Sequence, residues 1–190
     1  MQDRVINNTS KVVGIIRADK IRWNLLQLVR GLRLPDCWIG AGFVRNAVWD
    51  HLHGRAPSPL KGDVDVIWFD PANSAADLDR RYEEVLRAWE PSVVWSVKNQ
   101  ARMHEKNGDS PYVSVADAMR HWPETATAVA VRRTDQDDCD VASPLGLDDL
   151  MGLVLRPTPL FAGTKRSIYI ERLENKRWTA SWPLLREMAA

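Results

Sequence analysis

Apolar positions along the chain fall into two patterns, a helical spacing in some stretches and short unbroken runs in others, which together predict an α+β fold. Residues 19–34 form the first expected helix, with Asp19 as its N-terminal cap and Pro35 just after its end. Its apolar face comprises Ile21, Leu25, Leu28, Val29 and Leu32. Residues 64–69 are apolar on both faces, which is typical of a strand inside a sheet.

The rest of the chain up to Pro159 divides into short elements separated by glycine, proline and polar turns. The expected helices are 43–53, 73–89, 114–122 and 148–155, and the expected strands are 38–39, 93–98, 126–132 and 139–142. The last two strands form a hairpin around the acidic residues 135–138. After Pro159 the pattern is mixed and predicts no particular element.

Length and composition limit the classes of protein. The 190 residues suit one domain, 1–190, and a hydrophobic fraction of 45% supplies a sizeable core. A formal net charge of +1 argues against a domain that holds long nucleic acid by charge alone. The N-terminus lacks the apolar segment of a signal peptide, and no apolar run is long enough to cross a bilayer. We therefore expect a cytoplasmic protein with no membrane partner.

A strand, a glycine-containing turn and a helix form one unit in residues 38–54. Gly40 and Gly42 would let a phosphate approach the backbone, because neither carries a side chain. The N-terminus of the following helix offers backbone N–H groups to an anion. Arg45, in the first turn of that helix, can give a bidentate fork to phosphate oxygens or can be an ordinary surface residue. The unit predicts a phosphate-binding site.

Two aspartates, Asp63 and Asp65, begin the next strand. Residues i and i+2 of a strand point to the same side, so the two carboxylates lie side by side and repel one another. A divalent cation relieves this repulsion, and Mg²⁺ prefers carboxylate oxygens together with the phosphates of a substrate. We therefore expect Asp63 and Asp65 to bind Mg²⁺, or Mn²⁺ in its place, as in two-metal phosphoryl-transfer sites.

The hairpin supplies a candidate for a third carboxylate. Asp140 is the expected third metal ligand and the residue that helps to activate the acceptor, with Asp138 as its competitor. An aspartate at the end of a loop, with no part in the chemistry, is an equal alternative.

A polar segment follows the strand 93–98. It contains four further candidates for binding a triphosphate or an acceptor: Lys98, Asn99, Arg102 and His104. Lys98 and Arg102 would share a face if the chain turns helical after the strand. We expect this segment to lie on the same rim of the sheet as the aspartate pair, and the alternative is a solvated surface.

The residues from the glycine turn to the aspartate pair resemble the signature of the polymerase-beta nucleotidyltransferase superfamily. In the form found in tRNA-CCA-adding enzymes and poly(A) polymerases the turn reads Gly-Gly-x-Val-Arg-Asp, and residues 41–46 here read Ala-Gly-Phe-Val-Arg-Asn. Ala41 replaces the first glycine, and Asn46 replaces an aspartate that helps those enzymes to organise the site.

The chain also resembles a group of small bacterial nucleotidyltransferase-like proteins. This resemblance runs through residues 95–104, 121–132, 143–150 and 156–157 and covers most of the chain. It implies a polymerase-beta-like core, in which a mixed β-sheet flanked by helices carries the site at one end. It does not supply a substrate.

We therefore expect a metal-dependent nucleotidyltransferase that uses a nucleoside triphosphate and an unknown acceptor. The acceptor hydroxyl would attack the α-phosphorus in line and expel pyrophosphate. Such catalysis consists mainly of positioning and charge neutralisation, so few residues suffice. The alternative is a non-catalytic nucleotide-binding or regulatory relative of the same fold, which the replacement at Asn46 would indicate.

Overall fold

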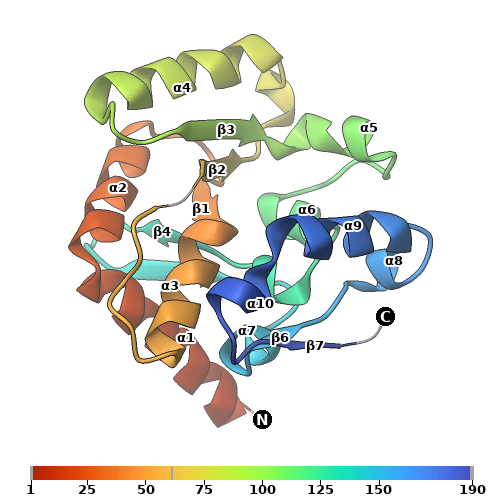
Figure 1. Ribbon diagram of the computed structural model, residues 1–190. Helices are drawn as coiled ribbons and strands as arrows, with labels where there is room; N and C mark the ends of the chain where they lie inside the picture. The colour runs from red at the N-terminus through yellow and green to blue at the C-terminus, as the bar shows by residue number, and fades with distance from the viewer. Residues whose placement is uncertain (1, 61, 189–190) are drawn as a thin grey trace.

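The computed structural model describes residues 2–60 and 62–188, and it has the expected α+β architecture (Figure 1). Its main sheet has five strands in the order β3-β2-β1-β4-β5. The strands are β1 (Trp38–Gly40), β2 (Val64–Trp68), β3 (Trp95–Asn99), β4 (Ala130–Arg133) and β5 (Cys139–Ala142). β2 and β3 are parallel and the other neighbours are antiparallel, so the sheet is mixed, as predicted.

The strand directions bring several chain segments to one edge of the sheet. Ile39 of β1 pairs in antiparallel register with Val66 of β2 on one side and with Val131 of β4 on the other. The end of β1 therefore lies beside the starts of β2 and β4. Because β3 is parallel to β2 and β5 is antiparallel to β4, the start of β3 and the end of β5 lie at the same edge.

Helices cover both faces of the sheet (Figure 1). Their bounds are α1 (Gln2–Ala18), α2 (Lys20–Gly31), α3 (Gly42–Leu52), α4 (Ala76–Trp89), α5 (Met103–Asn107), α6 (Val115–Met119), α7 (Asp148–Met151), α8 (Pro159–Ala162), α9 (Arg166–Lys176) and α10 (Trp178–Ser181). Single 3₁₀ turns occur at Pro71–Asn73, Gln100–Arg102 and Thr125–Thr127. Within the described residues, no helix is both long and apolar enough to span a membrane.

Strand β2 is buried on both faces, as its apolar sequence predicts. Val64, Val66 and Trp68 belong to the larger core cluster, which also contains residues of α1 to α4. Ile67 belongs to the smaller cluster on the opposite face, together with Met119 of α6. Alternation along the strand places Asp65 on the face of Ile67.

The first predicted helix forms as α2, and its capping is confirmed. Asp19 accepts hydrogen bonds from the backbone N–H groups of Ile21 and Arg22. The predicted apolar face is wrong at its start, because Ile21 is 62% exposed. Arg22 is buried instead, where it pairs with Asp19 and donates from Nε to the carbonyl of Phe43 at 2.8 Å.

Other boundaries differ from the predicted ones for local reasons. The expected helix 148–155 ends at Met151, and residues 154–155 form β6, which pairs with β7 (Arg186–Glu187). The stretch 126–132 begins as a 3₁₀ turn and becomes a strand only at Ala130. The hairpin with 139–142 is confirmed.

The segment after Pro159, for which the sequence predicts no element, folds against α3. Trp182 donates from Nε1 to Asp50 at 2.8 Å. The rings of Trp178 and Trp182 meet the ring of Trp49 edge-on, at centroid distances of 6.1 and 5.2 Å. Because this segment covers one side of α3 and the sheet covers the other, α3 is buried over most of its circumference.

Candidate active site

A row of small residues crosses the sheet at the level of Asp65. Ser96 of β3 pairs with Asp65, and continuing the β1–β2 register by one residue places Gly40 beside it on the other side. Gly40 pairs in turn with Ala130, and Ala130 pairs with Ala142. Paired residues point to the same face of a sheet, so Asp65 projects from a floor of small side chains. At Gly40 the ring of Trp122 packs on this floor, and Ala130 is fully buried in the cluster that also contains Met119.

The carboxylate of Asp65 is electrostatically strained. Burial and, to a smaller extent, the neighbouring charge of Asp63 raise its pKa to about 6. Three cationic side chains oppose this shift, in the order Arg172, Arg45 and Lys176. The two predicted aspartates therefore sit close enough to repel, in an environment that also contains arginine and lysine.

In the turn after β1, the residue with the unusual backbone conformation is Ala41. Ala41 has φ 54° and ψ −124°, a backbone conformation that L-residues rarely adopt. It occupies the position of the first glycine in the Gly-Gly form of the turn. Gly42 has no positive φ, and a Cβ there would meet nothing closer than 3.6 Å. Gly40 is needed for packing, because a Cβ there would lie 3.0 Å from the ring of Trp122.

Arg45 is not a surface residue, since it is only 6% exposed. Its Nη1 donates to Thr127 Oγ1 at 2.8 Å, and its Nη2 donates to Asn46 Oδ1 at 3.0 Å. The guanidinium lies 4.5 Å from the ring centre of Trp178 and 4.9 Å from that of Trp49. Burial lowers the pKa of Arg45 to about 10. The guanidinium of Arg45, which the sequence predicts to bind phosphate, thus donates its hydrogen bonds to Thr127 and Asn46.

Asp140 does not join the aspartate pair. Asp140 pairs with Arg132, which is two residues further along β4 than Ala130. Its strand, β5, is the third strand from β2 in the sheet. Its carboxylate accepts from Arg132 Nη2 at 2.8 Å, and its side chain is 45% exposed. It borders a cavity of about 900 Å³ between α2 and the β4–β5 hairpin. Its competitor Asp138 pairs with Arg17 at 3.1 Å.

The expectation that the segment from Lys98 to His104 shares the rim of the aspartate pair is wrong. The parallel register pairs Lys98 with Ile67 and Asn99 with Trp68. The segment therefore leaves the sheet at the edge opposite the start of β2. Parallel strands deliver their carboxyl ends to the same edge, and the aspartates stand at the amino end of β2.

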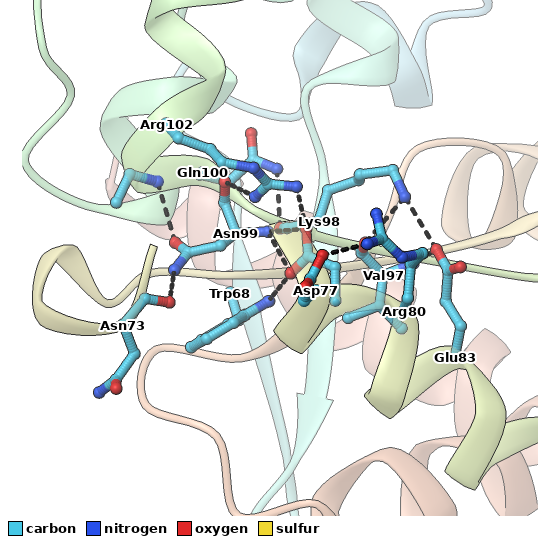
Figure 2. Close-up of polar contacts among 12 residues, drawn as sticks. Trp68, Asn73, Asp77, Arg80, Glu83, Val97, Lys98, Asn99, Gln100 and Arg102 are labelled. Carbon is cyan, nitrogen blue, oxygen red and sulfur yellow. Dashed lines mark hydrogen bonds and ion pairs between the residues drawn. The ribbon is translucent and has the colours of Figure 1, made fainter. Parts of the chain in front are cut away.

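The polar groups of this segment hold α4 to the sheet (Figure 2). Lys98 Nζ donates to Glu83 at 2.8 Å. Asn99 is buried and its amide donates to the carbonyl of Asn73 at 3.0 Å. Arg102 pairs with the buried carboxylate of Asp79. His104 lies on α5 with its ring 6.0 Å from that of Tyr112. We infer a structural role for Lys98, Asn99 and Arg102, and leave the segment out of the candidate site.

Comparison with known proteins agrees with this geometry. The profile of a family described as nucleotidyltransferase matches residues 27–186. The chain belongs to this nucleotidyltransferase family. No curated protein matches the sequence. The family and the fold place the chain in the polymerase-beta-type nucleotidyltransferase superfamily.

Solved structures show the same fold. An NMR structure described as revealing a CCA-adding enzyme head domain is 33% identical, with a TM-score of 0.84 over 95% of this chain and 96% of that one. The Thermotoga maritima CCA-adding enzyme complexed with tRNA is 15% identical with a TM-score of 0.58, and a CCA-adding enzyme with CTP is 15% identical with a TM-score of 0.61. The two superpositions include 96% and 95% of this chain, but only 42% and 43% of the two enzymes. It thus spans about two fifths of their length.

Two cationic residues that influence the charge of Asp65 are not found from the sequence. Arg172 and Lys176 lie on α9, in the segment that the apolar pattern leaves unassigned. Their spacing of four residues is a signal for one helical face. The sequence does not indicate where this face lies in the fold, because its place depends on how Trp178 and Trp182 pack against Trp49 of α3.

Proposed function

We propose that this member of the nucleotidyltransferase family transfers a nucleotidyl group from a nucleoside triphosphate to an acceptor hydroxyl. The observation that carries the proposal is the placement of Asp65 beside Gly40. It brings the aspartate pair and the turn that begins α3 to one edge of the sheet.

The donor set suits a divalent cation. Asp63 and Asp65 offer carboxylate oxygens, the ligands that Mg²⁺ prefers, and their mutual repulsion favours a bound cation. Nucleotidyltransferases of this kind generally use divalent metal ions. When bound, Mg²⁺ would neutralise charge that builds up on the phosphate oxygens during transfer. We propose Mg²⁺ as the physiological ion and Mn²⁺ as a substitute.

The reaction needs little chemistry from the protein. The acceptor oxygen forms a bond to the α-phosphorus, the bond from that phosphorus to the bridging oxygen breaks, and pyrophosphate leaves. The hydroxyl proton passes to water or to a nearby carboxylate. The chain's part is to hold the triphosphate at the edge where the turn that begins α3 meets the aspartate pair, and to offset its negative charge. The relative that binds CTP supports a nucleotide substrate. We infer no acceptor, because the chain spans only part of the enzymes that bind tRNA or CTP.

A non-catalytic nucleotide-binding role is the second candidate. Asn46 stands where CCA-adding enzymes carry an aspartate, and its amide oxygen accepts from Arg45. The described residues contain no group of three carboxylate, histidine or cysteine side chains suited to one metal ion. A protein with this arrangement could bind a nucleotide with its metal and transfer nothing.

A transfer assay separates the two roles. The purified protein is incubated with each of the four α-³²P-labelled nucleoside triphosphates, Mg²⁺ or Mn²⁺, and a pool of cellular RNA and small hydroxyl compounds. Label in an acceptor together with released pyrophosphate establishes transfer. Tight, metal-dependent nucleotide binding without pyrophosphate release for any nucleotide would favour the binding role.

A further inference from the structure

Arg172 is anchored at one edge of its guanidinium and open at the other. Its Nε donates to Glu124 Oε1 at 2.6 Å, and Glu124 is fully buried. Within the described part of the chain, neither Nη1 nor Nη2 of Arg172 donates to a protein group, and the side chain is 31% exposed. An arginine fixed through Nε keeps its two outer nitrogens free for an anion.

A shared tryptophan places Arg172 near the turn that begins α3. The guanidinium of Arg172 lies 5.4 Å from the ring centre of Trp178, and that of Arg45 lies 4.5 Å from the same centre. The outer nitrogen of Arg45 is in turn 3.6 Å from the point that a Cβ of Gly42 would occupy. Arg172 is therefore two contacts away from the turn.

Lys176 extends the same helix face by one turn. Residues i and i+4 of a helix are neighbours, so Lys176 follows Arg172 along α9. Lys176 is exposed, and within the described residues it forms no salt bridge with a carboxylate. Trp178, which Arg172 meets, also meets Arg45, so the face shared by Arg172 and Lys176 begins beside the turn that opens α3.

We propose that Arg172 and Lys176 of α9 bind the β- and γ-phosphates of the nucleotide, with Glu124 as the residue that positions Arg172. The inference deepens the proposed function and rests on it. The cation pair would stabilise the charge that the pyrophosphate acquires as the bond to the α-phosphorus breaks. It assigns to α9 the role that the sequence predicts for Arg45, whose Nη atoms already bind Thr127 and Asn46.

The first test measures binding of Mg²⁺-tripolyphosphate and of Mg²⁺-nucleoside triphosphate by calorimetry. Lys176→Met removes one cation from an exposed position. Arg81→Met, on the exposed face of α4, removes one cation far from the site and is the matched control (Figure 1). We expect Lys176→Met to weaken both ligands about tenfold, the loss of one charged hydrogen bond, and the control to bind as wild type. The binding of Mn²⁺ alone should be unchanged or tighter, because a neighbouring cation has been removed.

A second pair of variants tests the positioning role. Arg172→Lys keeps the charge but loses the two-pronged fork, and Glu124→Gln keeps the shape of the anchor but loses its charge. We expect both to raise the KM for the nucleotide by about tenfold, with a smaller change in the affinity for Mn²⁺. Melting curves identify a variant that fails to fold, and Lys176→Met then decides alone.

The outcomes separate the two claims. Wild-type affinity for tripolyphosphate in folded Lys176→Met and Arg172→Lys overturns the α9 assignment and leaves the proposed function standing. A wild-type protein that binds neither Mn²⁺ nor any triphosphate overturns both. Loss of tripolyphosphate affinity in the α9 variants, with retained Mn²⁺ binding, supports the assignment.

Discussion

The folded protein disfavours the charged form of Asp65, so the stability of the metal-free protein should depend on pH. Its pKa is raised to about 6 by burial and by Asp63, compared with about 3.9 in an unfolded chain. The folded state therefore binds the proton more tightly, and its stability without metal falls as the pH rises from about 4 to about 6. Asp65→Asn should raise the metal-free stability by about 1–2 kcal/mol at pH 7 and leave it nearly unchanged at pH 4.

Urea denaturation in EDTA at the two pH values measures this difference. Asp135→Asn is the control, because Asp135 is 88% exposed in the hairpin loop. It should show no gain at pH 7. Equal stabilities of Asp65→Asn and wild type at pH 7 would mean that the carboxylate is well solvated, contrary to the site described.

Ala41 holds the strained position of the phosphate-side turn. A non-glycine residue at φ 54° and ψ −124° costs on the order of 1–3 kcal/mol. Ala41→Gly restores the Gly-Gly form of the turn and should raise the free energy of unfolding by about 1 kcal/mol. Ala88→Gly, at an exposed position in the last turn of α4, should lower it by up to about 1 kcal/mol. Thermal or urea unfolding of both variants tests the backbone assignment.

At the scale of elements, the contacts between α4 and β3 lead to a prediction about stability. The buried carboxylate of Asp79 accepts from Trp68 Nε1 at 2.9 Å and from the backbone N–H of Asn99, and it pairs with Arg102. Arg102→Ala leaves this carboxylate without its ion pair and should destabilise the fold by about 3 kcal/mol. Nucleotide affinity should not change where the variant is folded. A variant of wild-type stability that binds nucleotide weakly would return this segment to the active site.

Local sequence patterns predict the helices and strands better than they predict which residues meet at one edge of the sheet. The apolar run of β2, the Asp19 cap and the β4–β5 hairpin follow from residues within one segment, and all three are present. The prediction that residues 98–104 share the rim of the aspartate pair is wrong, because the direction of a strand is set by its long-range pairing and not by its own sequence. Asp140 was predicted from its alternation in a strand, and no local signal reports that its strand lies three positions from β2.

At the scale of the whole molecule, the C-terminal segment completes the site from outside the local motif. Trp178 and Trp182 anchor it on α3, and Arg172 of α9 meets Trp178. A sequence motif can name the turn and the aspartates, since both are contiguous. It cannot name Arg172, Lys176 or Glu124, because their approach depends on the packing of aromatic side chains far apart in the sequence.

This anchoring predicts a stability effect away from the chemistry. Trp182→Phe keeps an aromatic ring against Trp49 but removes the donor to Asp50, whose other oxygen accepts from the backbone N–H of Ser58. The partly unsatisfied buried carboxylate should cost about 1–3 kcal/mol. Trp89→Phe, at a tryptophan that is 48% exposed, should cost less than about 0.5 kcal/mol. Equal losses in urea unfolding would mean that the C-terminal segment is not held through Asp50.

The proposed transfer reaction requires Asp63 and Asp65 to hold the metal ion that the nucleotide needs. Titration of Mn²⁺ followed by electron paramagnetic resonance, with and without a nucleoside triphosphate, tests this directly on wild type and on the double variant Asp63→Asn with Asp65→Asn. The wild type should bind Mn²⁺, and the triphosphate should tighten that binding. The double variant, with its fold intact, should lose at least about tenfold in Mn²⁺ affinity. Unaltered Mn²⁺ binding in the double variant would contradict the assignment of the site.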